Sequence, residues 1–594
     1  MSDIVTADQY PNPTLDGFFI QMGQGNDIIA VEQIIQQELG AGWNIQPFGD
    51  QTGFFDVTKP GSNLAVATAW ETTYRLRANA SVAFAEPVFT AAVFGRTDWN
   101  PPGPPPLARA PLPGPALDAL NWGGILDQIC MPADDLPASQ RDCEWSIQQI
   151  RVPEAWATYF PDAHGAAGTN IVVGHPDTGY TLHPEIKDNL LIARGHDFYE
   201  PDDDAQDDLI RDGWFPTPGH GTGTASVIIS PQGPPPGKTG SFVSGVAGGA
   251  RLIPYRVSPS VVLPSTLYLA QAIEQAAIDG AQVISISMGG VFAERLHQAI
   301  LFAQQHGVIV LAAAGNCVRF VVWPAAYDEV IAVAACDAAQ QPWAGSSRGS
   351  AVDVTAPGAG VWIADVDAQG TPIVRQGSGT SYAVAAVAGL AALWLAYHTR
   401  QQDLQGYSAN QIPALFSQIL HDTCVAQTDP SWSPGDFGAG LVDAVALLAA
   451  PLPPPEVITP ALVAAGEQGN LATFGHLFEQ HLPGPAGLVA AAPVIHPLPD
   501  VLAEVLNTAP ATLPDHLTQV GQELAFHLAT DPTLYWQFAQ GLMARSAPPV
   551  LPAEVPTLAP AAAAGAEHVA ALRSTLLQKG VSAALQSRLT PPTG

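Results

Sequence analysis

Short apolar runs alternate with helical stretches along residues 145–450. Five continuous apolar runs have the pattern of strands buried on both faces of a parallel sheet, at 170–174, 251–257, 281–287, 307–313 and 329–334. Apolar residues at helical spacing lie between them, for example at 266–279 and 293–306. The alternation predicts an α/β domain with a doubly wound, mostly parallel sheet. In such a sheet, functional sites lie at the carboxyl ends of the strands.

The first 92 residues have a shorter mixed pattern. Strands are expected at 17–21, 54–57 and 82–88, and helices at 27–39 and 64–78. The order strand, helix, strand, helix, strand predicts a small ferredoxin-like α/β sandwich.

Two proline-rich stretches divide the chain. The first lies within residues 93–144 and predicts an extended, exposed linker. The second begins at Pro451. Beyond it, apolar spacing predicts a series of short helices, at 470–480, 499–506, 514–528, 532–545 and 566–580. We therefore expect four parts, which are residues 1–92, 93–144, 145–450 and 451–594.

The composition narrows the choice of partners. The chain of 594 residues has 22 Lys and Arg against 54 Asp and Glu, a net charge of −32, which repels nucleic acid and anionic membranes. The uncharged run that ends near Tyr397 is shorter than the ~20 residues of a bilayer span, so it predicts a core helix. The first ten residues lack the basic and apolar regions of a signal peptide, which leaves both an extracellular and a cytoplasmic location open.

The five cysteines and the histidines have no spacing typical of a metal site, so we expect no catalytic metal or other required cofactor. The cysteine pairs 130/143 and 317/336 are either disulfides or buried thiols. Because the number of cysteines is odd, at least one is free or pairs between chains.

A candidate nucleophile lies at the start of the longest apolar stretch. Ser381 follows two nearby glycines and precedes the apolar run from Val384 to Leu395. Free N–H groups and the positive end of the dipole at a helix N-terminus favour developing negative charge. Tight packing of small residues is the alternative explanation.

Three other segments end apolar elements with polar side chains. Asp177 follows an apolar strand, His220 lies between glycines before an apolar helix, and Asn316 ends another strand. A serine hydroxyl needs an imidazole to take its proton, and the imidazole needs a carboxylate to orient it. An amide donor stabilises the oxyanion that results. The set therefore favours acyl-transfer chemistry over separate turn and capping roles.

These segments resemble the motifs of the subtilisin-like serine proteases, or subtilases. The resemblance covers about residues 145–448 and rests on Asp-Thr-Gly at 177–179, Gly-His-Gly-Thr at 219–222, Ala-Gly-Asn at 314–316 and Gly-Thr-Ser-Tyr-Ala at 379–383. It implies a serine endopeptidase that cleaves polypeptides with Asp177, His220 and Ser381 as its triad. Asn316 would be the oxyanion donor. The alternative is a catalytically silent relative that acts as a binding or scaffolding module.

The resemblance also implies substrate-binding residues. In the family, the backbone of the segment Ser287, Met288 and Gly289 pairs with an extended substrate, and Ala314 and Gly315 line the same site. Val322 stands where many relatives keep a small residue at the floor of the primary specificity pocket. We therefore predict a preference for small or medium apolar side chains over Phe or Tyr.

Two further expectations follow from the family. Residues 1–92 resemble a propeptide that assists folding and inhibits the protease until cleavage between Phe89 and Arg141; a permanently attached accessory domain is the alternative. The acidic stretch 197–212 before His220 is either a structural Ca²⁺ site or a solvated loop.

Overall fold

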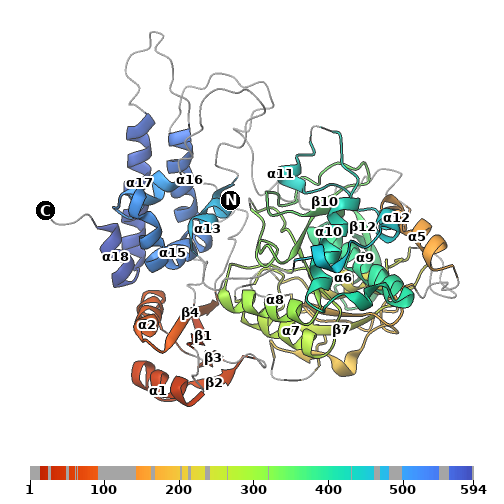
Figure 1. Cartoon of the computed structure of the whole chain (residues 1–594), viewed down its shortest axis with the longest axis horizontal. Helices are drawn as coiled ribbons and strands as arrows, with labels where there is room; N and C mark the ends of the chain where they lie inside the picture. Colours follow the sequence, from red (N-terminus) through yellow and green to blue (C-terminus); the bar gives the residue numbers. More distant parts are fainter. Residues whose placement is uncertain are drawn as a thin grey trace, which may run out of the picture. The chain divides into compact units, whose positions relative to one another are not determined.

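A seven-stranded sheet forms the centre of the unit Ala108–Val463 of the computed structural model (Figure 1). Its strand order is β11-β10-β9-β8-β5-β7-β6, and every pair is parallel. The strands are β5 (Val172–Asp177), β6 (His196–Asp197), β7 (Arg251–Arg256), β8 (Val283–Ile286), β9 (Ile309–Ala313), β10 (Ile331–Cys336) and β11 (Val354–Pro357). The predicted parallel α/β sheet is confirmed.

The chain changes direction at β5. After β5 it adds β7 and β6 on one side, and it then adds β8 to β11 on the other. A crevice opens at the carboxyl end of the strand where such a reversal occurs. Asp177 is the last residue of β5, so it lies at this switch point.

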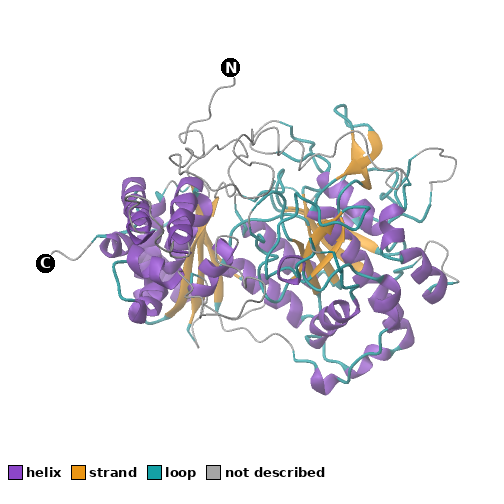
Figure 2. Ribbon diagram, turned by 90° about the horizontal axis from the view of Figure 1, so that it is seen from above, coloured by secondary structure: helices purple, strands orange, loops and turns teal. Residues whose placement is uncertain are grey.

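Helices cover both faces of the sheet (Figure 2). The backbone at Gly174 lies against Ala276 of α7 (Leu267–Ile278), whereas the side chain of His175 contacts Thr224 of α6 (His220–Ile229). Because successive residues of a strand face opposite sides, α6 and α7 cover opposite faces. Helix α8 (Glu294–Gln305) packs beside α7, and α9 (Thr380–Gln401) packs beside α6.

Helix α9 is the core helix of this unit. It is apolar around its whole circumference, and it is the one helix among the described residues long and apolar enough to cross a membrane. Its most apolar window is 89% buried within the protein, and it contacts β8 to β11. Helix α9 is therefore long and apolar because it is buried against the sheet.

Smaller elements complete the unit. They are the helices α4 (Trp145–Gln149), α5 (Val152–Tyr159), α10 (Gln411–Thr423), α11 (Pro434–Phe437) and α12 (Ala444–Ala449), and the antiparallel hairpin of β12 (Val361–Val366) and β13 (Pro372–Gly377). Three of the four cysteines of this unit that the structure describes, Cys143, Cys336 and Cys424, are free, whereas Cys317 is disulfide-bonded. Of the two alternatives for the pairs 130/143 and 317/336, the disulfide is therefore wrong, and Cys336 is a buried thiol.

The other unit joins the two ends of the chain, Met1–Leu107 and Ala464–Gly594. Its antiparallel sheet has the order β2-β3-β1-β4, with strands β1 (Thr14–Met22), β2 (Asn44–Pro47), β3 (Phe54–Thr58) and β4 (Val82–Thr90). Helices α1 (Ile28–Leu39) and α2 (Val66–Ala78) connect them. The C-terminal helices are α13 (Leu471–Phe478), α14 (Leu498–Val505), α15 (Leu513–Thr530), α16 (Pro532–Ser546), α17 (Ala561–Lys579) and α18 (Ala583–Leu589). Strand β2 and helix α18 were not predicted from the sequence pattern.

The structure describes residues 14–90, 142–459, 469–479, 498–546 and 561–590, except for short gaps at 24–27, 49–52, 60–61, 63, 162–166, 201, 203, 212–215, 234–240, 264, 319 and 430. The expected linker at 93–144 lies outside the described residues except for its last three positions, and so does almost all of the expected cleavage region.

Candidate active site

Asp177 ends β5 with its side chain fully buried. Its Oδ1 atom accepts hydrogen bonds from His220 Nδ1 at 2.7 Å and from the N–H of Thr178 at 2.7 Å. Burial opposes ionisation, but the His220 ring and these bonds hold the pKa of Asp177 below its usual value. Asp177 is therefore a carboxylate that fixes the orientation of the His220 ring.

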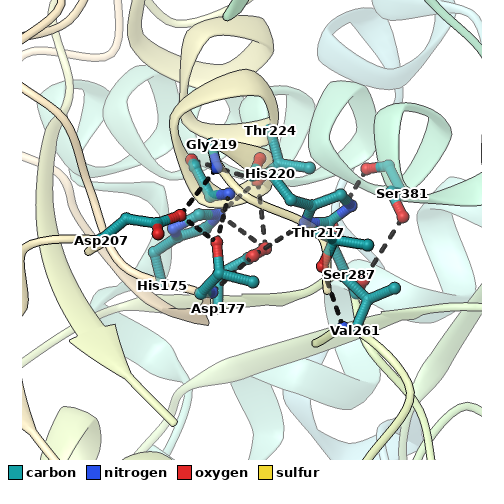
Figure 3. Close-up of polar contacts among 12 residues, drawn as sticks. His175, Asp177, Asp207, Thr217, Gly219, His220, Thr224, Val261, Ser287 and Ser381 are labelled. Carbon is teal, nitrogen blue, oxygen red and sulfur yellow. Dashed lines mark hydrogen bonds and ion pairs between the residues drawn. The ribbon is translucent and has the colours of Figure 1, made fainter. Parts of the chain in front are cut away.

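His220 is the first residue of α6, and its ring is 12% exposed. The helix can begin this close to Asp177 because residue 221 is glycine: a Cβ there would collide with the carbonyl oxygen of Gly179. Figure 3 shows the His220 ring between the side chains of Asp177 and Ser381. One edge of the imidazole is thus anchored, and the other is directed toward a hydroxyl.

Asp207 braces the two turns that carry Asp177 and His220. Its Oδ2 atom accepts hydrogen bonds from the hydroxyl of Thr178 at 2.9 Å and from the N–H of Gly219 at 2.8 Å. One buried carboxylate therefore ties the residue after Asp177 to the residue before His220. Sequence reasoning did not single out this role, because Asp207 is only one of several aspartates in the acidic stretch.

A second histidine lies behind Asp177. The His175 Nε2 atom is 3.0 Å from the hydroxyl of Thr224, which donates to Asp177 Oδ2 at 3.2 Å. Burial lowers the pKa of His175, so its ring is neutral near pH 7. The spacing held a signal for both residues: His175 shares a strand face with Asp177, and Thr224 shares a helix face with His220.

Ser381 is the second residue of α9 and is 4% exposed. Its hydroxyl donates to the carbonyl oxygen of Ser287 at 3.3 Å, and the Ser287 hydroxyl donates to the Ser381 carbonyl at 3.1 Å. These two bonds join the start of α9 to the segment after β8.

Thr380 fixes the amide of Asn316. The Asn316 Oδ1 atom accepts from the N–H of Thr380 at 2.9 Å and from its hydroxyl at 2.9 Å. Because a backbone N–H can only donate, the accepting atom is the oxygen, and Nδ2 is left as a donor on an exposed residue. A Cβ at Gly379 would lie 3.3 Å from this Nδ2 and 3.7 Å from the Ser381 nitrogen. The missing side chain of Gly379 thus leaves space beside both of these nitrogen atoms.

Val322 lies beside the predicted substrate-binding residues. It is buried, and its N–H donates to the carbonyl oxygen of Ala314 at 3.0 Å. A Cβ at Gly289 would collide with one of its methyl groups, and a Cβ at Gly315 would lie 3.1 Å from the other. Val322 therefore fills the space between two of the predicted substrate-binding segments.

The N–H and the carbonyl of Gly289 are both already hydrogen-bonded, and both partners belong to residues 261–263. Its N–H donates to the carbonyl oxygen of Val261 at 3.0 Å, and its carbonyl accepts from the N–H of Leu263 at 2.8 Å. Met288 beside it is 3% exposed. The edge expected to pair with substrate is thus covered by residues 261–263.

The acidic stretch before His220 is organised by an arginine. Arg256, 2% exposed, contacts Asp197 through Nη1 at 2.9 Å and Asp208 through Nη2 at 2.9 Å. Asp204 accepts from the hydroxyl of Tyr180 at 2.9 Å. Among the described residues, no group of three or more His, Cys, Asp or Glu side chains is arranged to hold a metal ion.

Several known proteins are similar to this chain in sequence. Residues 168–440 match the subtilase family. The chain is 30% identical to thermitase of Thermoactinomyces vulgaris over 299 residues, which is 50% of this chain and 94% of thermitase. It is 30% identical to the major intracellular serine protease of Bacillus subtilis over 284 residues, which is 46% of this chain and 79% of that protein.

A solved structure shares the fold. Fervidolysin of Fervidobacterium pennivorans, described as a keratinolytic enzyme related to subtilisin, superposes with a TM-score of 0.52 at 22% identity, over 76% of this chain and 62% of its own. Its resemblance supports the α/β architecture and nothing finer.

Proposed function

The chain belongs to the subtilase family of serine endopeptidases, and we propose that Asp177, His220 and Ser381 are its catalytic triad. The observation that carries the proposal is the hydrogen bond of 2.7 Å between His220 and the buried carboxylate of Asp177, on the side of the ring away from Ser381. An imidazole anchored in this way takes the proton of the attacking hydroxyl and returns it to the leaving amine.

The oxyanion donors of this proposal are Asn316 Nδ2 and the N–H of Ser381. Thr380 directs the first, and the start of α9 supplies the second. Donors fixed before the reaction stabilise the tetrahedral intermediate without a reorganisation cost. The carbonyl that Ser381 attacks would enter the space over Gly379.

Polypeptides are the proposed substrates, in an extended conformation along residues 287–289. Because Gly289 is paired with residues 261–263, we propose that this loop moves aside when a peptide binds. The side chain before the scissile bond would then meet Val322, which favours small or medium apolar residues.

Labelling with a fluorophosphonate tests the nucleophile. We expect the probe to modify Ser381, and we expect Ser381→Ala to abolish the modification. Ser378→Ala is the matched control, because Ser378 lies in the same turn and accepts a bond from Gly360 at 2.9 Å. A chain that is folded but unlabelled after removal of residues 1–141 would instead support the silent-relative alternative.

We also propose that residues 1–92 act as a propeptide and inhibitor. The slow folding of long-range parallel sheets is a physical reason for such an assistant. Mass spectrometry of purified protein over time would show a cut between Phe89 and Arg141 in the wild type and none in Ser381→Ala. An uncut but active wild type would favour the accessory-domain alternative.

Subtilases need no cofactor for catalysis. A structural Ca²⁺ ion in the acidic stretch stays a hypothesis, and the contacts of Arg256 argue that this arginine supplies the positive charge there.

A further inference from the structure

Helix α15 of the C-terminal region packs on the α/β domain of residues 14–90. The ring of Phe526 lies 4.8 Å from the ring of Phe89 on β4 and 6.1 Å from that of Trp70 on α2. All three side chains are at most 7% exposed. An aromatic cluster buried in this way is typical of the centre of a protein interface.

Gln522, one helical turn before Phe526, is held on both sides of its amide. Its Nε2 donates to Glu86 of β4 at 2.8 Å, and its Oε1 accepts from the guanidinium of Arg77 on α2. Gln522 and Glu86 are 6% and 2% exposed. Both the oxygen and the nitrogen of this buried amide are hydrogen-bonded to the α/β domain. Water does not easily take the place of these partners, so the contact favours the joined state.

Glu523 completes the contact with a buried carboxylate. It is fully buried and accepts from the hydroxyl of Tyr74 on α2 at 2.9 Å. Its other partners are the N–H and hydroxyl of Ser582, at 2.8 and 2.6 Å, before α18. The α/β domain thus supplies one of the donors that this carboxylate requires.

We propose that residues 469–590 are a binding domain for the α/β domain of residues 14–90, and that the two stay joined when the chain between Thr90 and Asp142 is cut. Among the described residues, the contact is formed by side chains more than 430 positions apart in the chain, for example Glu86 and Gln522.

The interface has a consequence for processing, and this consequence rests on the proposed function. A single cut after Thr90 would not release the inhibitor-like domain, because the helical domain connects it to the catalytic domain through residues 459–469. Release would require a second cut within residues 459–469, and the α/β domain and the helical domain would then leave the catalytic domain together.

The test uses the full chain with Ser381→Ala, a recognition sequence for a site-specific protease inserted between Pro113 and Gly114, and an affinity tag at the C-terminus. After complete cutting, the tagged fragment is immobilised and washed. We expect residues 1–113 to be retained in a ratio of about one to one. Because this chain has no nucleophile, the result does not depend on the proposed activity.

Interface variants make the test specific. Gln522→Ala with Phe526→Ala should release the fragment at least about ten-fold faster. Gln519→Ala is the matched control, because Gln519 lies on the same helix and contacts Arg588 of α18 instead. Tyr74→Phe with Arg77→Met weakens the contact from the other side and leaves the core of α15 intact.

Circular dichroism of each cut sample serves to check that both pieces remain folded. Loss of a folded fragment from the chain that carries Ser381→Ala and no interface substitution would overturn the proposal. Retention of the fragment by both folded double variants, as firmly as by Gln519→Ala, would also overturn it.

Discussion

The side-chain oxygen of Asn316 accepts both hydrogen bonds that Thr380 offers, each 2.9 Å long. Thr380, the neighbour of the proposed nucleophile, thereby fixes the orientation of the amide group of a residue 64 positions earlier. Loss of this donor should destabilise the transition state and should change the affinity for substrate little.

Asn316→Ala and Asn316→Asp should each lower kcat by about 10²–10³, the known effect of losing the equivalent donor in subtilisin, and should change KM little. Asp keeps acceptors for Thr380 but has no N–H. Steady-state kinetics on a chromogenic peptide measures both values. Gly379→Ala should lower kcat as well, because its methyl group enters the space beside Nδ2. Unchanged kcat in Asn316→Asp would remove the donor role.

Asp207→Ala should lower kcat by on the order of 10², because a small misplacement of the reacting groups has that cost. The change frees the Thr178 hydroxyl and the Gly219 N–H together. A positioning role also predicts a shift in the pH profile of kcat/KM, since His220 would be less firmly held by Asp177. Asp208→Asn is the control, because its carboxylate contacts Arg256 instead. Equal losses in both variants would contradict this role.

Val322→Ala should raise kcat/KM for peptides with Phe before the scissile bond relative to those with Ala, by ~10-fold or more. Removal of two methyl groups opens the space between Gly289 and Gly315. Val321→Ala makes the same change at a neighbouring buried residue and should leave the preference as it was. A wild-type enzyme that already prefers Phe would exclude the pocket assignment.

Arg256→Met should lower the free energy of unfolding by about 3–5 kcal/mol, because it leaves the buried carboxylate of Asp197 without its cation. Denaturation in urea, in the Ser381→Ala background, measures the loss.

The same contacts predict that EDTA leaves the Tm of the unsubstituted chain unchanged. A clear fall in Tm with EDTA, reversed by Ca²⁺, would show that the acidic stretch holds an ion after all.

Asp353→Asn should stabilise the protein increasingly as the pH rises. Burial raises the pKa of Asp353 to about 6, although the N–H of Ala332 donates to it at 2.7 Å. The folded protein therefore holds this proton more tightly than the unfolded chain does. The stabilising effect of that proton is complete below the unfolded pKa, near 3.8, and is lost as the pH rises through about 6.

The gain from Asp353→Asn should be small at pH 4 and reach on the order of 2 kcal/mol at pH 8. Urea denaturation at both pH values in the Ser381→Ala background measures it. Asp367→Asn is the contrast, because N–H groups such as that of Thr371 lower the pKa of this exposed carboxylate. A gain for Asp353→Asn that is the same at pH 4 and pH 8 would contradict the titration.

The local pattern of apolar and polar residues was enough to predict the central sheet and the residue types of the candidate site. The central strands β5 and β7 to β10 are recognisable in the sequence because burial on both faces demands continuous apolar runs. The exposed strand β13 carries no such run, and β2 has only four residues, so both were missed. The candidate residues Asp177 and Ser381 stood out because each follows or begins an apolar element beside glycine.

Tertiary structure alone decided which side chains meet. The role of Asp207 became visible only in the structure, where the hydroxyl of Thr178 and the N–H of Gly219 both donate to one of its oxygen atoms. The cover of residues 261–263 over Gly289, and the contact of Gln522 with Glu86, join segments that no local periodicity relates. The physical reason is that periodicity reports how deeply an element is buried, whereas the partner of a buried polar group depends on the path of the whole chain.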